Sequence, residues 1–144
     1  MADRQVLLFR IGCWAAILTA AVHMAGHLAG PQAPANETEQ QLLDVAGSYQ
    51  FALPGGGRRA LLDFLNGFSL SFIVLLATLG GIGLMVAKRG RGDVLLTGVA
   101  RLLAAGSVGL LVISFTHWFI VPTIFIAFFT LCFVLAAVPK PADG

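Results

Sequence analysis

The sequence predicts an all-α fold, a bundle of four transmembrane helices that forms a single membrane domain over residues 1–144. Hydrophobic residues make up 58% of the chain and charged residues only 11%, whereas soluble domains average about 45–50% and about 25%. The apolar residues gather in four runs, at about 7–28, 61–86, 94–115 and 122–138. Each run can cross ~30 Å of hydrocarbon as a helix that rises ~1.5 Å per residue.

Length, charge and cysteine content exclude several classes of function. A chain of 144 residues with four spans has no room for a soluble catalytic module. The net charge is only +2, and the basic residues stand at the ends of the apolar runs, so nucleic acid is not an expected partner. Cys13 and Cys132 lie inside apolar runs without a CxxC motif. This predicts buried, inert thiols rather than thiol–disulfide chemistry.

The first run, 7–28, carries two histidines. His23 and His27 are four positions apart, so on a helix both imidazoles occupy one face, one turn apart. Because a polar side chain is costly in lipid, this face is expected to look toward other helices. Small residues at steps of three or four continue the face and would let a neighbouring helix approach closely; they are Gly12, Ala16, Thr19, Gly26 and Gly30. Gly30 and Pro31 end the helix.

The start of the first run also has features of a signal peptide, because Arg4 and Arg10 precede the apolar residues. The run nevertheless continues into His23, and no A-x-A-like site follows at once. We therefore expect a retained span.

Residues 31–60 form the one long connection. Asn36 and Glu39 have the spacing of a capping box. The apolar residues that follow predict a short amphipathic helix on the membrane surface, in the first extracytoplasmic loop; they are Leu42, Leu43, Ala46, Tyr49 and Phe51. Pro54 and the three glycines after it predict a flexible break, and Arg58 and Arg59 mark the interface.

The other runs add polar residues at their ends. Asp63, Gly67 and Ser71 make a stripe on the second run that is expected to face the bundle, and Asn66 lies nearby. Glycines 80, 81 and 83 predict close packing or a bend near the far end of this run. Ser114 lies at the end of the third run and His117 follows just after it, with Trp118 at a place typical of an interfacial belt.

The fourth run starts at Pro122, a residue favoured at the first helical position. It is nearly all apolar and rich in phenylalanine. Such a helix is expected to face lipid or a ligand on most sides.

Basic residues predict the orientation. Arg4, Arg10, Lys88, Arg89, Arg91 and Lys140 gather on one side of the four runs, and Arg58 and Arg59 stand on the other with several acids. By the positive-inside rule the chain is a multi-pass protein of the cell inner (plasma) membrane, with both termini cytoplasmic and the long loop outside.

Four spans in this orientation bring the polar residues to one layer on the outer side. We expect a ligand-binding site there, because ionisable groups at membrane depth are functional candidates. The predicted site residues are His23, His27, Asp63, Asn66, Ser114, His117 and Trp118.

Three uses of this layer are compatible with the sequence. In the first, Asp63 accepts a hydrogen bond from His27 or His117, Asn66 and Ser114 satisfy His23, and the network only fixes helix register. In the second, the residues line a pocket that grips the polar end of a sterol, quinone or lipid, or that performs acid–base chemistry with His and Asp. In the third, the histidines and Asp63 bind zinc or another transition metal, or a histidine pair holds haem; no HExxH motif accompanies them.

The segment LLDFLNGFSLSF, preceded by a Gly-rich loop that ends in arginine, resembles a family of small bacterial four-helix integral membrane proteins of uncharacterised function. The family's first span typically ends like Gly26-His27-Leu28, and its second opens like Asp63-Phe64 followed by Gly67-Phe68. More distantly the layout is similar to DoxX-like proteins, a resemblance that implies association with redox membrane complexes. It is also similar to the sterol-handling EXPERA group, whose membrane-embedded glutamates have no counterpart here.

The sequence therefore predicts a small integral membrane protein that binds a small amphiphile or packs as an accessory subunit of a membrane complex. The alternative is a membrane-embedded enzyme that uses His and Asp, or a metal- or haem-binding protein. The expected partners are the lipid bilayer, an amphiphilic ligand, and a partner subunit or a second copy of the chain. No catalytic residue, metal site or cofactor is assigned.

Overall fold

The structure is a computed structural model that describes residues 3–30, 33–88 and 93–138. Within these residues it contains five helices and one two-stranded hairpin: α1 Asp3–Leu28, α2 Glu37–Ser48, β1 Gln50–Ala52, β2 Arg58–Ala60, α3 Leu61–Ala87, α4 Val94–His117 and α5 Ile120–Ala137. Helices α1, α3, α4 and α5 are long and apolar enough to cross a membrane. The predicted all-α bundle of four spans is confirmed. Pro31, Arg89, Arg91 and Lys140, used in the sequence predictions, lie outside the described residues.

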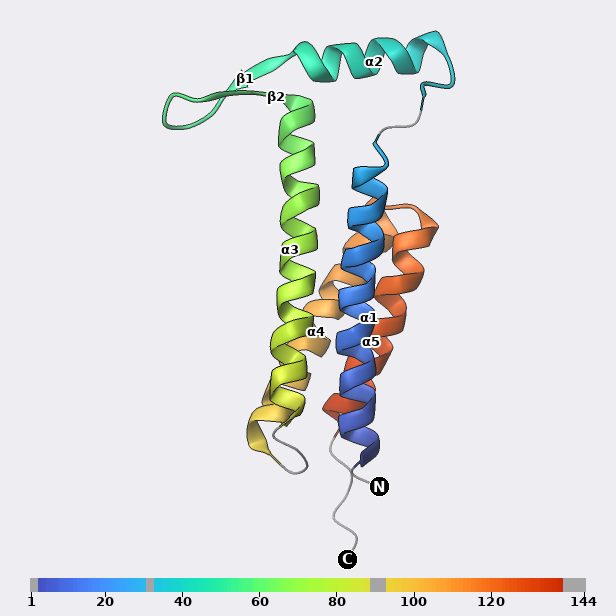
Figure 1. Ribbon diagram of the computed structural model, residues 1–144, viewed down its shortest axis with the longest axis vertical. Helices are drawn as coiled ribbons and strands as arrows, with labels where there is room; N and C mark the ends of the chain where they lie inside the picture. Colours follow the sequence, from blue (N-terminus) through green and yellow to red (C-terminus); the bar gives the residue numbers. More distant parts are fainter. Residues whose placement is uncertain (1–2, 31–32, 89–92, 139–144) are drawn as a thin grey trace, which may run out of the picture.

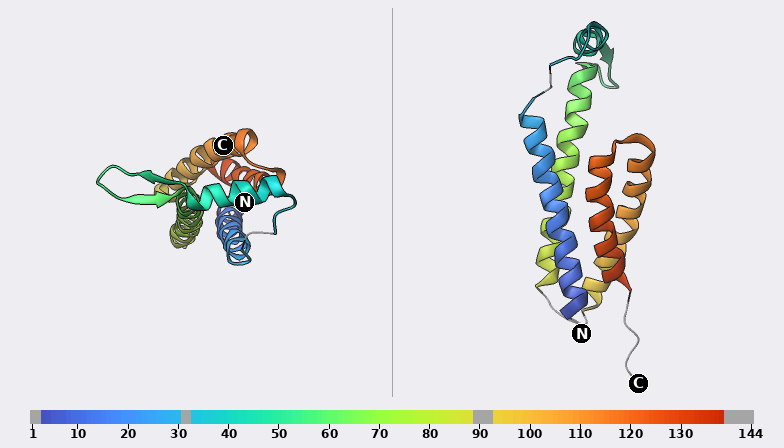
Figure 2. Two further views of the ribbon diagram at one scale, coloured as in Figure 1. Left: turned by 90° about the horizontal axis from the view of Figure 1, so that it is seen from above. Right: turned by 90° about the vertical axis from the view of Figure 1, so that its right-hand side faces the viewer.

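The four long helices run side by side, and α2 lies across one end of them (Figure 1). We call this end the α2 end, and the opposite end, where α1 begins and α5 ends, the terminal end. Helix α1 packs against both α3 and α5, and α5 packs against α4, whereas α3 and α4 touch over only a few residues. Viewed from the side, α3 rises beyond the turn that joins α4 to α5 (Figure 2).

Glycines bring α1 and α3 into close contact. A Cβ on Gly80 would lie 2.8 Å from the backbone oxygen of Cys13, and one on Gly83 would meet the Cys13 Sγ. A Cβ on Gly81 would meet nothing within 4 Å. The close packing predicted for this glycine cluster is therefore confirmed at two of its three positions. On the other side of α1, Gly12 makes room for the ring of Phe133 on α5.

The apolar core lies toward the terminal end. Its largest fully buried side chains include Phe9, Leu96 and Phe129, from α1, α4 and α5. Cys13 and Cys132 are buried and free. At the α2 end, by contrast, the first eight residues of α3 are all exposed. The well-packed half of the bundle thus fixes the helices, and the other half leaves space between them.

The amphipathic helix expected in the long connection is α2. The Oδ1 of Asn36 accepts a hydrogen bond from the N–H of Glu39 at 2.9 Å, as the capping box predicts. The Glu39 carboxylate accepts from the N–H of Ala35 at 2.7 Å, instead of from Asn36. Ala46 is buried, while Leu42 and Val45 are exposed, so α2 has an apolar surface available to a bilayer.

Two local predictions were wrong. The glycine-rich segment is the turn of an antiparallel hairpin that pairs Gln50 with Ala60, because Gly55 (φ 97°) and Gly56 (φ 90°) adopt left-handed conformations that reverse the chain. Pro122 is also not the first residue of α5, which begins at Ile120. Proline is tolerated there because the first N–H groups of a helix have no partner within it.

Candidate functional site

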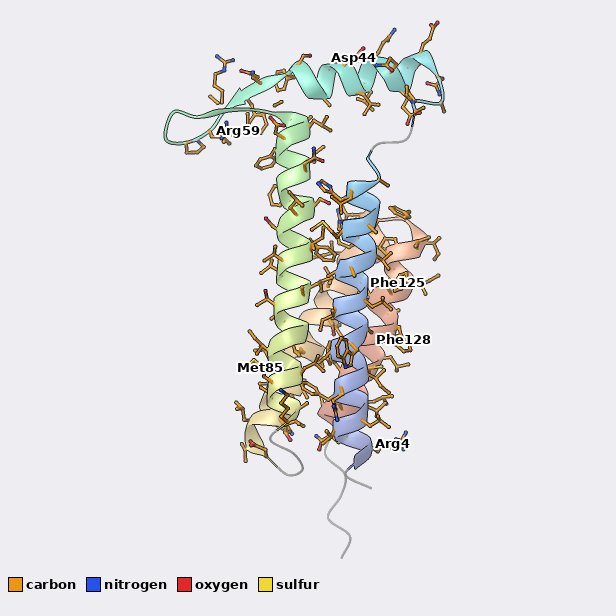
Figure 3. All side chains as sticks on the ribbon, viewed as in Figure 1. Arg4, Asp44, Arg59, Met85, Phe125 and Phe128 are labelled. Carbon is orange, nitrogen blue, oxygen red and sulfur yellow. The ribbon has the colours of Figure 1, made fainter. Side chains whose placement is uncertain are left out.

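A cavity of about 680 Å³ opens at the α2 end between α1, α3 and α5, next to the end of α4. We call it the histidine cavity, because all three histidines of the chain line it. Its walls come from the four long helices and the turn between the last two: Thr19, Val22, His23, Gly26, His27, Phe68, Ser69, Phe72, His117, Trp118, Phe119, Val121, Pro122, Phe125 and Ile126. Phe125 is labelled on α5 in Figure 3.

Helix α1 supplies two of the imidazoles. Thr19, His23 and His27 are four residues apart and share one face of the helix. The Nε2 of His23 forms a 2.9 Å hydrogen bond with the Oγ of Ser69 on α3, and its ring stands edge-on to Phe72 with centroids 5.6 Å apart. His27 is half-buried and has no hydrogen-bond partner among the described residues. One α1 histidine is therefore fixed against α3, and the next is free to meet a ligand.

The end of α4 supplies the third imidazole. Helix α4 stops at His117, where Trp118 leaves the helical conformation and its N–H bonds to the carbonyl of Ser114 at 3.0 Å. The indole ring of Trp118 packs edge-on to Phe72 with centroids 5.2 Å apart. The Nδ1 of His117 lies 2.6 Å from the Oγ1 of Thr116. The short turn into α5 thus places His117 and Trp118 at the cavity wall.

Ser114 does not line the cavity. It is fully buried, and its hydroxyl shares a 2.6 Å hydrogen bond with the hydroxyl of Thr123 on α5. The expected pairing of Ser114 and Asn66 with His23 is wrong, because Ser69 occupies that place. Ser114 instead ties α4 to α5 beneath the cavity.

Asp63 also stands apart from the histidines. It lines a second pocket of about 430 Å³ with Arg59 and Phe64. Asp63 and the three histidines all lie among the described residues, and no hydrogen bond joins the Asp63 carboxylate to any of these histidines. Ser69, which contacts His23, is six residues further along α3, about 9 Å of helix rise. Asn66 is exposed and lines neither pocket. The expectation of a single shared layer holds for the histidines and fails for the acid.

The predicted polar stripe of α3 faces the wrong way for a shared site. Gly67 and Ser71 line the second pocket, and the Ser71 hydroxyl bonds to the Gly67 carbonyl of its own helix at 2.8 Å. The buried residues Ile73, Leu76 and Gly80 mark the face that packs in the bundle. Ser69 and Phe72 lie beside that face. Sequence reasoning missed them because it expected the stripe of Asp63, Gly67 and Ser71 to face the bundle. The helical spacing from the glycines back to Phe72 and Ser69 was the signal that could have found them.

The histidine cavity is lined mostly by apolar side chains, with a few polar ones among them. Its polar side chains are the three histidines, Ser69 and Thr19, and the hydroxyl of Thr19 is already donated to the carbonyl of Ala15 at 2.7 Å. The other lining residues are apolar or aromatic, apart from Gly26. Pockets with apolar walls and a few convergent polar groups are typical of small-molecule sites.

The described residues contain no group of three or more His, Cys, Asp or Glu side chains that could hold a metal ion. The metal set considered from the sequence combined the three histidines with Asp63, and Asp63 lines the other pocket.

No family model, curated protein or solved structure matches this chain. The function is therefore inferred from the geometry of the histidine cavity.

Proposed function

We propose that the protein holds a small amphiphile, such as a lipid, a quinone or a sterol-like molecule, in the histidine cavity. The observation that carries this proposal is the convergence of His23, His27 and His117 on one otherwise apolar cavity. Its volume of about 680 Å³ falls within the range of ~300–1,000 Å³ usual for small-molecule sites. An apolar ligand body would pack against the phenylalanines, and its polar end would bond to imidazole.

The competing uses have less support. An accessory subunit that only packs would be expected to fill its interior, and a cavity of this size argues against that use of these residues. Acid–base chemistry by a His–Asp pair needs the two groups in one site, and Asp63 lies in the second pocket. Binding of an amphiphile needs neither a packed interior nor Asp63.

The proposal is tested by filling the cavity at a position where a side chain fits. Gly26 lines the cavity, and a Cβ there would meet nothing within 4 Å. In the variant Gly26→Leu the new side chain takes space that a ligand needs. We expect amphiphile that co-purifies with the protein, measured by native mass spectrometry, to fall about tenfold, as ~1–3 kcal/mol of overpacking implies.

Gly109→Leu is the matched control. Gly109 is a helical glycine of α4 that does not line the cavity, and a Cβ there also meets nothing within 4 Å. This variant should keep its co-purified amphiphile. An unmodified protein that carries no amphiphile, or an equal loss in both variants, would refute the proposal.

We also propose that the protein lies in the plasma membrane with both termini in the cytoplasm. Arg4 stands near the terminal end, while Arg59 and the acid Asp44 stand at the α2 end (Figure 3). Arg10 lies in the same half of α1 as Arg4. A bias of basic residues toward the terminal end supports this orientation, and it is compatible with the resemblance to small bacterial four-helix, distantly DoxX-like, proteins. The histidine cavity would then open in the outer half of the bilayer.

A further inference from the structure

The hydroxyl of Thr116 has three hydrogen-bonding neighbours at the end of α4. Its Oγ1 lies 3.0 Å from the carbonyl oxygen of Val112 and 3.1 Å from that of Ile113. It also lies 2.6 Å from the Nδ1 of His117. A hydroxyl has a single proton to donate and two lone pairs to accept with.

Only one placement of the protons makes every one of these contacts favourable. Carbonyl oxygens cannot donate, so the Thr116 proton must point toward them, in the backbone bond that threonine commonly forms within a helix. The Oγ1 then accepts, and the Nδ1 of His117 must donate. If the hydroxyl donated to Nδ1 instead, its oxygen would face two carbonyl oxygens at about 3 Å with no proton between them.

A neutral imidazole carries one N–H. With that proton held at Nδ1, the Nε2 of His117 is an acceptor, and His117 lines the histidine cavity. His23 and His27 have no comparable arrangement. The Ser69 hydroxyl that meets His23 has no second bond among the described residues, and His27 has no partner there. These two rings can therefore suit a donor or an acceptor equally, whereas His117 suits a donor.

We propose that the place beside His117 in the histidine cavity selects amphiphiles whose polar end is a hydroxyl, such as a sterol, a quinol or a long-chain alcohol, over ethers, ketones and quinones. This inference rests on the proposed function, since it concerns which amphiphile the cavity takes. The hydroxyl donates to the Nε2 of His117. An ether or carbonyl oxygen brought to the same place would face a lone pair and stay without a partner. Thr116 acts as the positioning residue.

Quenching of Trp118 fluorescence measures the selection. The chain has two tryptophans, and Trp14 is 59% exposed on α1, outside the cavity lining. The variant Trp14→Phe leaves Trp118 as the one reporter. In nanodiscs, the protein is titrated with a long-chain alcohol brominated on its alkyl chain, and with the methyl ether of the same alcohol. We expect half-maximal quenching by the alcohol at a concentration about two- to tenfold lower, the value of one hydrogen bond.

Thr116→Val, built in the same background, tests the cause. Valine has nearly the shape of threonine, and Thr116 is exposed, so the fold should be kept. Without the hydroxyl the proton of His117 is free to move to Nε2 and bond to the ether. The preference for the alcohol should fall to about one. Thr78→Val is the matched control, because Thr78 is exposed on α3 and does not line the cavity; it should keep the preference.

A second measurement does not depend on a ligand. Nitrogen NMR of histidine-labelled protein, with the ring of His117 assigned by its loss in His117→Ala, reports which nitrogen is protonated. We expect Nδ1–H with an unprotonated Nε2, and a shift toward mixed tautomers in Thr116→Val.

The possible failures are distinct. If neither probe quenches Trp118 and Gly26→Leu changes nothing, the cavity takes no amphiphile and the proposed function fails. If both probes quench equally, or Thr116→Val keeps the preference, the cavity binds amphiphiles but the hydroxyl selection is refuted. A protonated Nε2 with a bare Nδ1 on a neutral His117 refutes it as well.

Discussion

At the scale of single residues, two glycines only one position apart have opposite surroundings. Gly80 faces α1, where a Cβ would lie 2.8 Å from the Cys13 backbone oxygen and 2.6 Å from the Ile17 side chain. Gly81 faces open space. Backbone cannot yield as a flexible side chain can, so the close approach of α1 and α3 depends on Gly80 and not on Gly81.

We therefore expect Gly80→Ala to lower the free energy of unfolding by about 1–3 kcal/mol, the usual cost of overpacking. Gly81→Ala should be neutral or stabilising by up to about 1 kcal/mol, since alanine favours the helix. Equilibrium unfolding of both variants in detergent micelles gives the comparison. Equal stabilities would mean that α1 and α3 do not touch where the structure brings them together.

The residue scale also shows what could be predicted of the site. Histidine is costly in lipid wherever it does not meet other protein groups, so the gathering of His23, His27 and His117 at one cavity between helices follows from the sequence. Asp63 obeys a different constraint. It lies in the first turn of a helix of 27 residues, which at ~1.5 Å per residue exceeds the ~30 Å of hydrocarbon. The depth of Asp63 in the membrane depends on where α1 meets α3, and the prediction of spans alone does not give that contact.

At the scale of elements, hydrogen bonds made by side-chain hydroxyls join α4 to α5. Ser114 and Thr123 share a buried hydrogen bond of 2.6 Å, and the hydroxyl of Thr130 donates to the carbonyl of Ser107 at 3.2 Å. Both contacts lie on the faces where the two helices pack. They fix the turn that carries His117 and Trp118, so the cavity wall depends on groups that do not line it.

Ser114→Ala should therefore loosen this pair of helices. We expect a loss of about 0.6–1.5 kcal/mol in the free energy of unfolding, the range for hydrogen bonds between membrane helices and in proteins generally. Ser71→Ala is a fitting comparison, because the exposed Ser71 bonds only within α3, and its effect should stay within about 0.5 kcal/mol. Steric-trap or denaturant unfolding distinguishes the two; a larger loss for Ser71→Ala would contradict this account.

The rotation of α3 about its own axis is the feature of the helices that the sequence did not predict. The four spans were predicted to within a few residues, because long apolar runs determine them. The rotation of α3 was not, since the helix is apolar on nearly all sides and offers two candidate faces. One carries Asp63, Gly67 and Ser71, and the other carries Gly80 and Gly83, which pack on α1. Polar residues at a helix end can stay near water, so the glycines were the better guide.

At the scale of the whole molecule, the proposed orientation can be checked from outside the cell. Cys13 and Cys132 are buried, so an added cysteine should dominate labelling by a membrane-impermeant maleimide. We expect Glu37→Cys, at the start of α2, to react in intact cells. Lys88→Cys, at the end of α3, should react only after permeabilisation. Both positions are exposed. The opposite pattern would invert the proposed topology, and the unmodified chain is the control.

The unequal lengths of α3 and α5 have a consequence for the surrounding bilayer. Helix α5 has 18 residues and α3 has 27, or about 27 Å against about 40 Å. Lipids beside the shorter helix meet a narrow apolar belt, and lipids beside the longer one meet a tall one. A bilayer responds to such mismatch by thinning locally. The annulus around the protein is therefore expected to be lopsided, with shorter or more disordered acyl chains gathered on the side of α5.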